Sequence, residues 1–337
     1  MTSRLLDTLL EKTVVPSFSS IGPGVRRRLY DWPELESYSL DDHVIVLTGG
    51  TSGIGEAAAK LYATLGATLI IIARNPEKTH NTVERLKEHT GNAAIHSVIG
   101  DLGVQDDVRR IASELAAKYP VIDVLAHNAG ALFNERKRAN NGTDLTVELM
   151  VSAPFLLTGL LLPQLGASNG EATSRQRPGR VLTMSSGGMY TEPLTVDALA
   201  MPDDSYQGAQ QYARAKRAQV VLNELWAEKI DKSRVVFHAL HPGWVATPGI
   251  TEALPGFSKV LGPLGLLRSP RDGADTLVWL SADATPEQCS GKFWHDRAQR
   301  TIHMSAKTRD ADTDEKRAQL WQWCEENTGF ELTQVTP

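Results

Sequence analysis

The sequence predicts an α/β protein in which helices cover both faces of a single, doubly wound parallel sheet. From residue 42 onward, apolar runs of strand length alternate with segments of helical periodicity, a pattern that gives parallel strands joined by crossover helices. The chain has 337 residues, of which 41% are apolar and 22% charged, enough for one large domain with a real core. No internal repeat or linker indicates a second sheet domain.

The predicted strands are short apolar runs, as expected for parallel strands that are buried on both faces. They lie at 44–47, 68–73, 94–100, 123–127, 180–185 and 235–240, with an edge strand at 291–294. The helices lie at 53–66, 76–89, 105–118, 145–165, 207–230, 272–281 and 313–327. Asn75 caps the second of these helices and Pro76 opens it. The polar stretch 168–179 is predicted to be a surface loop.

Residues 1–40 are predicted to be an N-terminal extension, residues 41–304 the α/β domain, and residues 305–337 a C-terminal helical extension. In the first of these parts, one face of a short helix is apolar and a basic triplet follows it at 26–28. The helix could pack on the body of the protein through this face. Alternatively, the face contacts a membrane surface or a partner, since apolar and basic residues together suit an anionic interface. The apolar face consists of Leu5, Leu6, Leu9 and Leu10.

Composition excludes several classes of function. A net charge of −5 and the lack of a basic, aromatic-rich stripe argue against nucleic-acid binding. Cys289 and Cys324 lack the spacing of a metal site, so we expect no metal and two free thiols in a reducing compartment, the cytoplasm. No apolar run reaches the roughly 20 residues that span a bilayer. Charged residues interrupt the first fifteen positions, which argues against a signal peptide.

A glycine-rich turn at residues 48–55 joins the first predicted strand to the first helix. Its glycines let the backbone turn tightly and approach a pyrophosphate, whose charge the helix N-terminus would stabilise. The spacing is Gly-x-x-x-Gly-x-Gly rather than the commoner Gly-x-Gly-x-x-Gly. The alternative is a tight turn that binds nothing. The expected cofactor contacts in the turn are Gly49, Thr51, Ser52, Gly53, Ile54 and Gly55.

Arg74 follows the second strand, where an NAD site carries an acidic residue for the ribose 2′-hydroxyl. A guanidinium there suits the 2′-phosphate of NADP(H), so we expect NADP(H), with NAD(H) as the alternative. An arginine that only faces solvent is the other interpretation. Two further groups follow the third and fourth strands and are expected beside the cofactor: Asp101 and Leu102, and Asn128, Ala129 and Gly130.

Tyr212 and Lys216 lie four residues apart on a predicted helix, so both side chains emerge from one face. An ammonium beside a phenol favours phenolate and can bring its pKa below the ordinary value of about 10. Such a pair can exchange a proton with a carbonyl or an alcohol. A tyrosine and a lysine at this spacing also occur by chance on exposed helices. Because Tyr212 and Lys216 follow a glycine turn in the same chain, we interpret them as a candidate catalytic pair.

Together, these ordered motifs resemble the short-chain dehydrogenase/reductase family over about residues 42–304. The resemblance implies a Rossmann-type domain that binds NAD(P)(H) and a small-molecule carbonyl or alcohol. It implies that Tyr212 exchanges a proton with the substrate oxygen, while Lys216 lowers the tyrosine pKa and binds the nicotinamide ribose. Ser186, the second serine after the fifth strand, would hold the substrate oxygen, and Ser185 would satisfy backbone. The segment expected at the nicotinamide end contains Pro242, Gly243, Val245 and Thr247.

One residue departs from the family pattern. The family commonly places an asparagine on the helix at 145–165, where it organises a water behind the lysine. Our alignment puts Met150 there, and a thioether cannot donate a hydrogen bond. Either another group positions the water, or the register is different, or turnover is slow.

The loops around the site indicate the substrate class. The segments 249–257 and 260–267 are rich in Leu, Gly and Pro, and we interpret them as a mobile apolar lid over a lipophilic substrate, with ordinary packing as the alternative. The loop 189–210 is expected to wall the same site. A cofactor-binding scaffold with weak or no turnover is the second functional hypothesis, and the glycine spacing argues against a sugar-nucleotide epimerase. The helices at 145–165 and 207–230 resemble a family dimer interface, so a homodimer is a further hypothesis.

Overall fold

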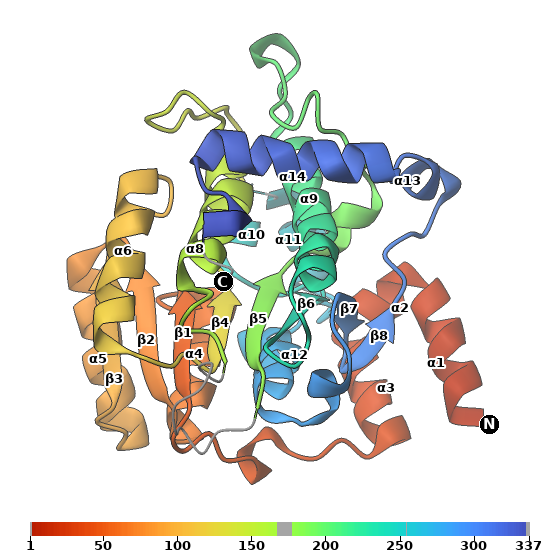
Figure 1. Ribbon diagram of the computed structural model, residues 1–337. Helices are drawn as coiled ribbons and strands as arrows, with labels where there is room; N and C mark the ends of the chain where they lie inside the picture. The colour runs from red at the N-terminus through yellow and green to blue at the C-terminus, as the bar shows by residue number, and fades with distance from the viewer. Residues whose placement is uncertain (1, 167–176, 254, 335–337) are drawn as a thin grey trace.

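The computed structural model describes residues 2–166, 177–253 and 255–334, and within them the predicted sheet is present (Figure 1). Its strand order is β3-β2-β1-β4-β5-β6-β7-β8, with every neighbouring pair parallel except β7 and β8. The chain thus winds outward in two directions from β1 and β4, which confirms the doubly wound fold. The strands are β1 (Val44–Thr48), β2 (Thr68–Ala73), β3 (Ile95–Ile99), β4 (Val124–His127), β5 (Gly179–Met184), β6 (Val235–His241), β7 (Lys292–His295) and β8 (Ala298–Arg300).

Helices cover both faces of the sheet, and each face has its own apolar cluster. On one face lie α4 (Gly53–Thr64), α5 (Pro76–Thr90) and α12 (Pro270–Ala282). On the other lie α6 (Gln105–Lys118), α8 (Ala153–Leu161) and α9 (Gly208–Lys229), with α14 (Asp314–Thr328) packed over them. The remaining helices are α1 (Thr2–Lys12), α2 (Val14–Phe18), α3 (Ile21–Tyr30), α7 (Leu145–Val147), α10 (Pro248–Ala253), α11 (Pro255–Leu261) and α13 (Ala306–Asp310), with short 3₁₀ turns η1 (Leu35–Ser37), η3 (Gly187–Tyr190), η4 (Asp203–Ser205), η5 (Thr285–Gln288) and η6 (Leu332–Gln334).

The long helix predicted at 145–165 is wrong as a single element. After α7 the chain opens into a π-helical turn, η2 (Glu148–Ser152), before α8 begins, and α8 ends at Leu161. Pro154 explains the interruption, because it has no N–H to donate to the carbonyl of Met150 and its ring would crowd that carbonyl in a regular helix. The apolar pattern continued through the break, so periodicity alone could not reveal it.

The strand predicted at 291–294 is present as β7, but it is not the edge of the sheet, because β8 pairs antiparallel with it on its outer side. A two-residue turn, Asp296 and Arg297, joins β7 to β8, and both residues have positive φ, at 51° and 55°. This conformation usually selects glycine or asparagine, so the turn carried no sequence signal. Most of the loop predicted at 168–179 lies outside the described residues. Cys289 and Cys324 are free, as predicted.

The N-terminal helix packs on the body of the protein through its charged residues and not through its leucines. Asp7 is buried, whereas Leu5, Leu6 and Leu9 are exposed by 63%, 52% and 54%. Of the two alternatives for this helix, packing on the body of the protein is thus present, but through the acidic residues and not through the apolar face. The interior contact of α1 is an ion-pair cluster centred on the fully buried Arg26 of α3.

This buried cluster joins distant parts of the chain. Arg26 donates to Asp7 at 2.7 Å, to Glu11 at 2.5 Å and to Asp296 of the β7–β8 turn at 2.5 Å. Arg268 donates to Asp296 at 2.5 Å as well, and Arg300 pairs with Asp7 at 3.0 Å. Three arginines thus face three carboxylates, which compensates the cost of removing each charge from water. The division into residues 1–40, 41–304 and 305–337 as separate parts stays a prediction.

The C-terminal helix α14 covers the helix pair that the sequence suggested as a dimer interface. Trp321 of α14 lies edge-on to Phe155 of α8, with ring centroids 5.0 Å apart, and to Trp226 of α9, at 4.8 Å. The apolar residues of α8 are therefore buried within this chain, which was the alternative interpretation. No helix among the described residues is long and apolar enough to cross a bilayer.

Candidate active site

The glycine turn lies between β1 and α4, beside the point where the strand order reverses between β1 and β4. Ligands of doubly wound sheets bind at such a point, beyond the carboxyl ends of the strands. Gly49 and Gly53 have positive φ, at 73° and 54°, and a Cβ on Gly55 would lie 2.0 Å from the Gly49 carbonyl oxygen. Only glycine fits this turn. Ser52 precedes α4 without a side-chain cap, so the first N–H groups of α4 are available to an anion.

Asn128 holds the turn in place from the end of β4. Its Nδ2 donates to the carbonyls of Thr48 and Gly49, both at 3.1 Å. The Thr48 hydroxyl in return accepts from the backbone N–H groups of Asn128 and Ala129, at 3.0 and 2.9 Å. The sequence placed Asn128 beside the cofactor, and the structure brings it, with Ala129, against the turn itself.

The residues predicted around the adenosine end occupy the neighbouring strand ends. Arg74 directly follows β2, is exposed, and forms no ion pair with the described residues. Asp101 follows β3, and its Oδ1 accepts from the N–H of Gly103 at 2.8 Å. Leu102 is only 8% exposed and belongs to the apolar cluster under α6. An adenine ring could therefore contact the backbone of Leu102 more readily than its buried side chain.

The candidate catalytic side chains converge from two elements next to this turn. Tyr212 and Lys216 share one face of α9, and Ser186 follows β5, the strand paired with β4. The Ser186 hydroxyl lies close enough to the Tyr212 phenol to favour its ionised form. Lys216 Nζ lies 5.3 Å from the centre of the tyrosine ring. The structure therefore brings together the three residues that the sequence grouped.

Buried backbone contacts fix the lysine beneath the tyrosine. Lys216 is 2% exposed and donates from Nζ to the Met184 carbonyl at 2.7 Å. The Ser185 hydroxyl donates to the Lys216 carbonyl at 3.0 Å. The Ser185 hydroxyl thus hydrogen-bonds a backbone carbonyl, as predicted, and Ser186 is the serine whose hydroxyl faces the tyrosine.

Burial dominates the electrostatics of the pair. Loss of solvent raises the pKa of Tyr212 to about 12, and the nearby Ser186 hydroxyl offsets this only in part. Burial lowers the pKa of Lys216 to about 7. The pKa of the phenol thus lies above its ordinary value because desolvation of phenolate dominates, and a lowering contribution from Lys216 stays a prediction. At neutral pH the phenol is a proton donor and Lys216 is divided between its charged and neutral forms.

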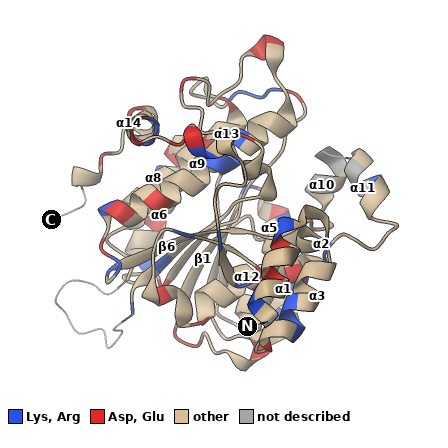
Figure 2. Ribbon diagram, turned by 90° about the vertical axis from the view of Figure 1, so that its right-hand side faces the viewer, with Lys and Arg blue, Asp and Glu red and all other residues tan. Residues whose placement is uncertain are grey.

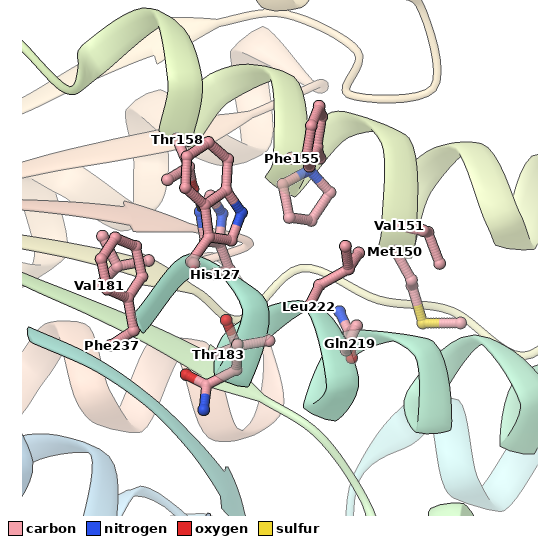
Figure 3. Close-up of a pocket in the computed structure, with 13 residues that line it drawn as sticks. His127, Met150, Val151, Phe155, Thr158, Val181, Thr183, Gln219, Leu222 and Phe237 are labelled. Atoms are coloured by element: carbon pink, nitrogen blue, oxygen red, sulfur yellow. Dashed lines mark hydrogen bonds between the residues drawn. The ribbon is translucent and has the colours of Figure 1, made fainter. Parts of the chain in front are cut away.

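Met150, the residue aligned with the family asparagine, is fully buried in η2 and lies near Lys216. Its Sδ and the Lys216 Nζ are 3.1 and 3.5 Å from the place that a Cβ on Gly130 would occupy. Met150 also lines a small internal cavity between α8, α9 and the sheet (Figure 3). The space open to the centres of water molecules there is about 20 Å³, enough for about one water.

Polar groups that the sequence gave no reason to select face this cavity. The amide of Gln219 has no protein partner at either atom in the described chain, and Asn223 Nδ2 has none either. His127 Nε2 lies 2.8 Å from the Thr158 hydroxyl, and burial lowers the pKa of His127 to about 3, so the ring is neutral. Gln219 lies three residues beyond Lys216 on α9, a spacing that could have indicated it once the helix face was known. These groups suit a bound water, and Lys216 is not among the residues that line the cavity.

The segment predicted at the nicotinamide end follows β6 and is held by the N-terminal extension. Phe18 of α2 accepts a hydrogen bond from the Trp244 N–H at 2.7 Å, and its ring packs edge-on against His241 with centroids 4.4 Å apart. Gly243 has φ of 79° and passes against the Arg268 guanidinium. These supporting residues lie far apart in the sequence, so only the fold reveals them.

Further along this segment, two residues face the glycine turn. The Thr247 methyl group lies 3.1 Å from the position of a Cβ on Gly53. Val245 is 2% exposed and packs against Gly273, so it supports the turn from behind. Pro242 is buried, and its carbonyl accepts from Arg268 Nη1 at 3.3 Å. Thr247 is thus the residue of this segment that approaches the cofactor turn most directly.

Comparisons with known proteins agree with this geometry. A family model described as short chain dehydrogenase matches residues 43–255. Dehydrogenase/reductase SDR family member 12 of Bos taurus is 33% identical over 274 residues, 81% of this chain and 82% of that protein. Four stretches of the present sequence, 184–189, 212–221, 241–248 and 273–276, already resembled that subgroup.

Two further proteins extend the comparison. Polyprenol dehydrogenase of Homo sapiens is 29% identical over 296 residues, 86% of each chain. A protein of Escherichia coli CFT073, solved in complex with NADPH, has a TM-score of 0.61 and 26% identity, covering 79% of this chain and 100% of that one. Because the family model covers more than half of the chain and includes this edge of the sheet, the chain belongs to the short-chain dehydrogenase/reductase family of oxidoreductases.

Proposed function

We propose that this protein is an NADP(H)-dependent oxidoreductase that interconverts a carbonyl and an alcohol on a lipophilic substrate. The observation that carries the proposal is the convergence of Ser186, Tyr212 and Lys216 beside the glycine turn. A hydroxyl, a phenol and an ammonium at one end of a dinucleotide-binding turn are the groups that proton exchange with a carbonyl oxygen needs.

Each side chain has a defined part in this proposal. Tyr212, a neutral phenol with a pKa of about 12, donates its proton to the carbonyl oxygen when the substrate is reduced. Ser186, whose hydroxyl lies near that phenol, donates to the same oxygen and stabilises its developing negative charge. Lys216 lies under the tyrosine and, in its charged form, stabilises the phenolate that remains.

The residues of the turn fit a nicotinamide dinucleotide. Gly55 has no room for a Cβ, and the N-terminus of α4 carries no side-chain cap. Arg74 follows β2, where a 2′-phosphate would lie, and pairs with no carboxylate of the described residues. When bound, the nicotinamide supplies or accepts the hydride. Arg74 supports NADP(H) over NAD(H), and the similar protein solved with NADPH supports a nicotinamide cofactor in general.

The substrate class rests on the apolar surroundings of the site. The chain after Thr247 forms α10 and α11 and then exposes Val260 and Leu264, by 63% and 65%. A related protein is named for a polyprenol, an isoprenoid alcohol. Both observations support a lipophilic ketone, aldehyde or alcohol, with the segments around 249–267 as a lid.

The proposal extends to the location and the oligomeric state of the protein. We place it in the cytoplasm, peripheral to a membrane that residues 1–40 contact. A homodimer remains a proposal, and it would need a surface other than the α8–α9 pair, because α14 covers that pair.

Turnover of NADPH with a panel of lipophilic carbonyls tests the enzyme proposal. We expect cofactor oxidation by the wild type and a loss of at least about 1,000-fold in kcat for Tyr212→Phe, with NADPH affinity kept. A Tyr119→Phe control removes a phenolic hydroxyl at the far end of α6 and should retain activity. Unchanged turnover in Tyr212→Phe would refute the assigned roles.

A binding protein with weak or no turnover is the second candidate, favoured by Met150 in place of a hydrogen-bonding side chain next to Lys216. Tight NADPH binding in calorimetry, together with no oxidation on any panel member, would favour it over the enzyme. Met150→Asn offers a direct comparison, since it should raise kcat if the thioether limits turnover.

A further inference from the structure

The first helix has an inverted burial pattern, with its acids inside and its leucines outside. Asp7 is 5% exposed and Glu11 contacts the Arg26 guanidinium, whereas Leu5, Leu6 and Leu9 face solvent by more than half of their surface. A helix that packed only for stability would bury the leucines, each worth about 1.5–3 kcal/mol. The buried ion pairs therefore hold α1 in an orientation that keeps its apolar face outward.

The exposed apolar side chains continue from α1 into neighbouring segments. Ser20 links α3 to the chain after α11, because its N–H donates to the Leu266 carbonyl at 3.0 Å and its hydroxyl to the Gly265 carbonyl at 2.7 Å. Figure 2 shows α1, α2 and α3 together on one side of the molecule. We call the exposed aliphatic residues of these segments the docking face: Leu5, Leu6, Leu9, Val14, Val15, Ile21, Val260 and Leu264. They are eight of the ten large apolar side chains exposed in the described residues.

The charges around the docking face have one sign. Residues 2–30 carry five basic and two acidic side chains, although the whole chain has a net charge of −5. Both acids are turned into the ion-pair cluster, and Arg4, Lys12 and Arg28 remain exposed, as does Lys259 of α11. Basic residues around an aliphatic face are typical of contact with an anionic lipid surface.

We propose that the docking face binds the surface of an anionic bilayer, with the aliphatic side chains in the interface and the basic residues at lipid headgroups. The docking face is aliphatic, whereas aromatic anchors dominate most protein–protein contacts, and the neighbouring exposed Tyr30 uses its hydroxyl to donate to the buried Asp7 at 3.0 Å. A protein partner or a second copy of this chain is therefore the less favoured occupant.

The docking face is connected to the candidate active site. Its α2 helix ends at Phe18, which receives the Trp244 N–H and packs on His241, next to the segment at the nicotinamide end. Val260 and Leu264 belong to the segment that we assign to the substrate lid. Given the proposed function, on which this step rests, docking would put that lid at the lipid surface, so a lipophilic substrate could enter without crossing water.

Co-sedimentation of the full chain with vesicles tests the docking, in the absence of cofactor and substrate. We expect binding to vesicles of phosphatidylcholine with 30% phosphatidylserine, and at least about tenfold weaker binding to phosphatidylcholine alone. The variant Leu5→Gln/Leu6→Gln/Leu9→Gln should lower the partition coefficient at least about tenfold. These side chains are exposed, so circular dichroism should show an intact fold.

Two charge variants separate specific docking from general attraction. Arg4→Glu/Lys12→Glu should lower binding to the anionic vesicles at least about tenfold, whereas Lys307→Glu/Arg309→Glu on α13 changes net charge equally and should have little effect. Equal losses in both would overturn the proposal. So would absence of vesicle binding by the wild type, or a concentration-dependent dimer that the leucine variant abolishes without any vesicle binding.

The docking and the proposed enzyme function can fail separately. Tyr212→Phe should bind vesicles like the wild type, since Tyr212 is not part of the docking face. If the wild type oxidises NADPH but does not bind vesicles, only the docking proposal is wrong. If it binds vesicles and no variant or substrate gives turnover, only the enzyme proposal is wrong.

Discussion

Lys216 shows how burial sets the chemistry of a single side chain. The ammonium contacts the Met184 carbonyl and has almost no solvent, so its pKa is lowered to about 7 from an ordinary value near 10.5. A lowered pKa means that the charged form is lost as pH rises through about 7. The lysine of this protein is therefore a titrating group at physiological pH, although its sequence context alone indicates a permanent charge.

We expect this titration to appear in the pH dependence of the reaction. If the charged lysine stabilises the phenolate, kcat/KM for NADPH should fall as pH rises through about 7, because this parameter reports groups of the free enzyme. In Lys216→Arg the side chain stays charged to above pH 12, so the fall near pH 7 should vanish, whatever the remaining activity. An unchanged inflection in the arginine variant would assign the titration to another group.

Arg74 offers a second test at the level of one side chain. Arg74→Ala should weaken NADPH binding about 10- to 100-fold, through loss of a charge-assisted contact to the 2′-phosphate, and NADH binding by less than about threefold. Isothermal titration calorimetry with both cofactors measures the difference. Lys118→Ala, at the far end of α6, removes the same charge and serves as the control. Equal losses for NADPH and NADH in the Arg74 variant would refute the 2′-phosphate role.

At the level of elements, α14 shows why the apolar helix predicted at 145–165 need not be a dimer interface. That stretch is broken by a π turn before Pro154, and its second half, α8, is covered from within the chain. Trp321 fills the space between Phe155 and Trp226, and Phe330 continues the same aromatic contact. The C-terminal segment thus supplies the apolar surface that a second subunit would otherwise have to provide.

Removing this cover should be costly. Trp321→Ala leaves a large cavity against Phe155 and Trp226, so we expect the free energy of unfolding to fall by about 3–5 kcal/mol. Trp323→Ala, on a half-buried neighbour of the same helix, should cost clearly less. Urea denaturation followed by circular dichroism measures both. A similar small loss in the two variants would mean that α14 contributes little to the fold.

The β7–β8 hairpin is the other element whose form depends on distant contacts. Asp296 and Arg297 adopt left-handed backbone conformations, which cost about 1–2 kcal/mol per non-glycine residue. Two contacts compensate this cost: Asp296 receives Arg26 and Arg268, and Arg297 pairs with Asp275 at 2.7 Å. The turn is thus held from outside the hairpin.

At the level of the whole molecule, the cluster around Arg26 joins the first helix to the last strands of the sheet. Arg26→Ala should leave the three carboxylates of the buried cluster facing only two arginines, Arg268 and Arg300, so we expect a loss of about 3–5 kcal/mol in the free energy of unfolding. Arg28→Ala removes an exposed arginine from the same helix and should change it by less than about 0.5 kcal/mol. Thermal and urea unfolding of both variants provide the measurement, and equal small effects would contradict the cluster's role.

The sheet and most of the candidate site could be predicted from the sequence because their signals are local. Apolar runs of strand length give the buried parallel strands, and a glycine turn between strand and helix gives the cofactor end. The Tyr212–Lys216 pair needs only helical spacing, and Arg74 needs only its place after a strand. In each case neighbouring residues determine the structure, so periodicity and spacing are sufficient.

The features that only the tertiary structure decided depend on contacts between distant residues. The leucines of α1 look like a packing face in sequence, yet Arg26 and Asp296, 270 residues apart, turn its acids inward and leave the leucines exposed. Likewise, Lys216 has a lowered pKa because the fold buries it, and the apolar α8 is covered because α14 returns to it. Which side chains are buried depends on the folded chain as a whole, so a local pattern does not determine which of two helix faces is turned inward.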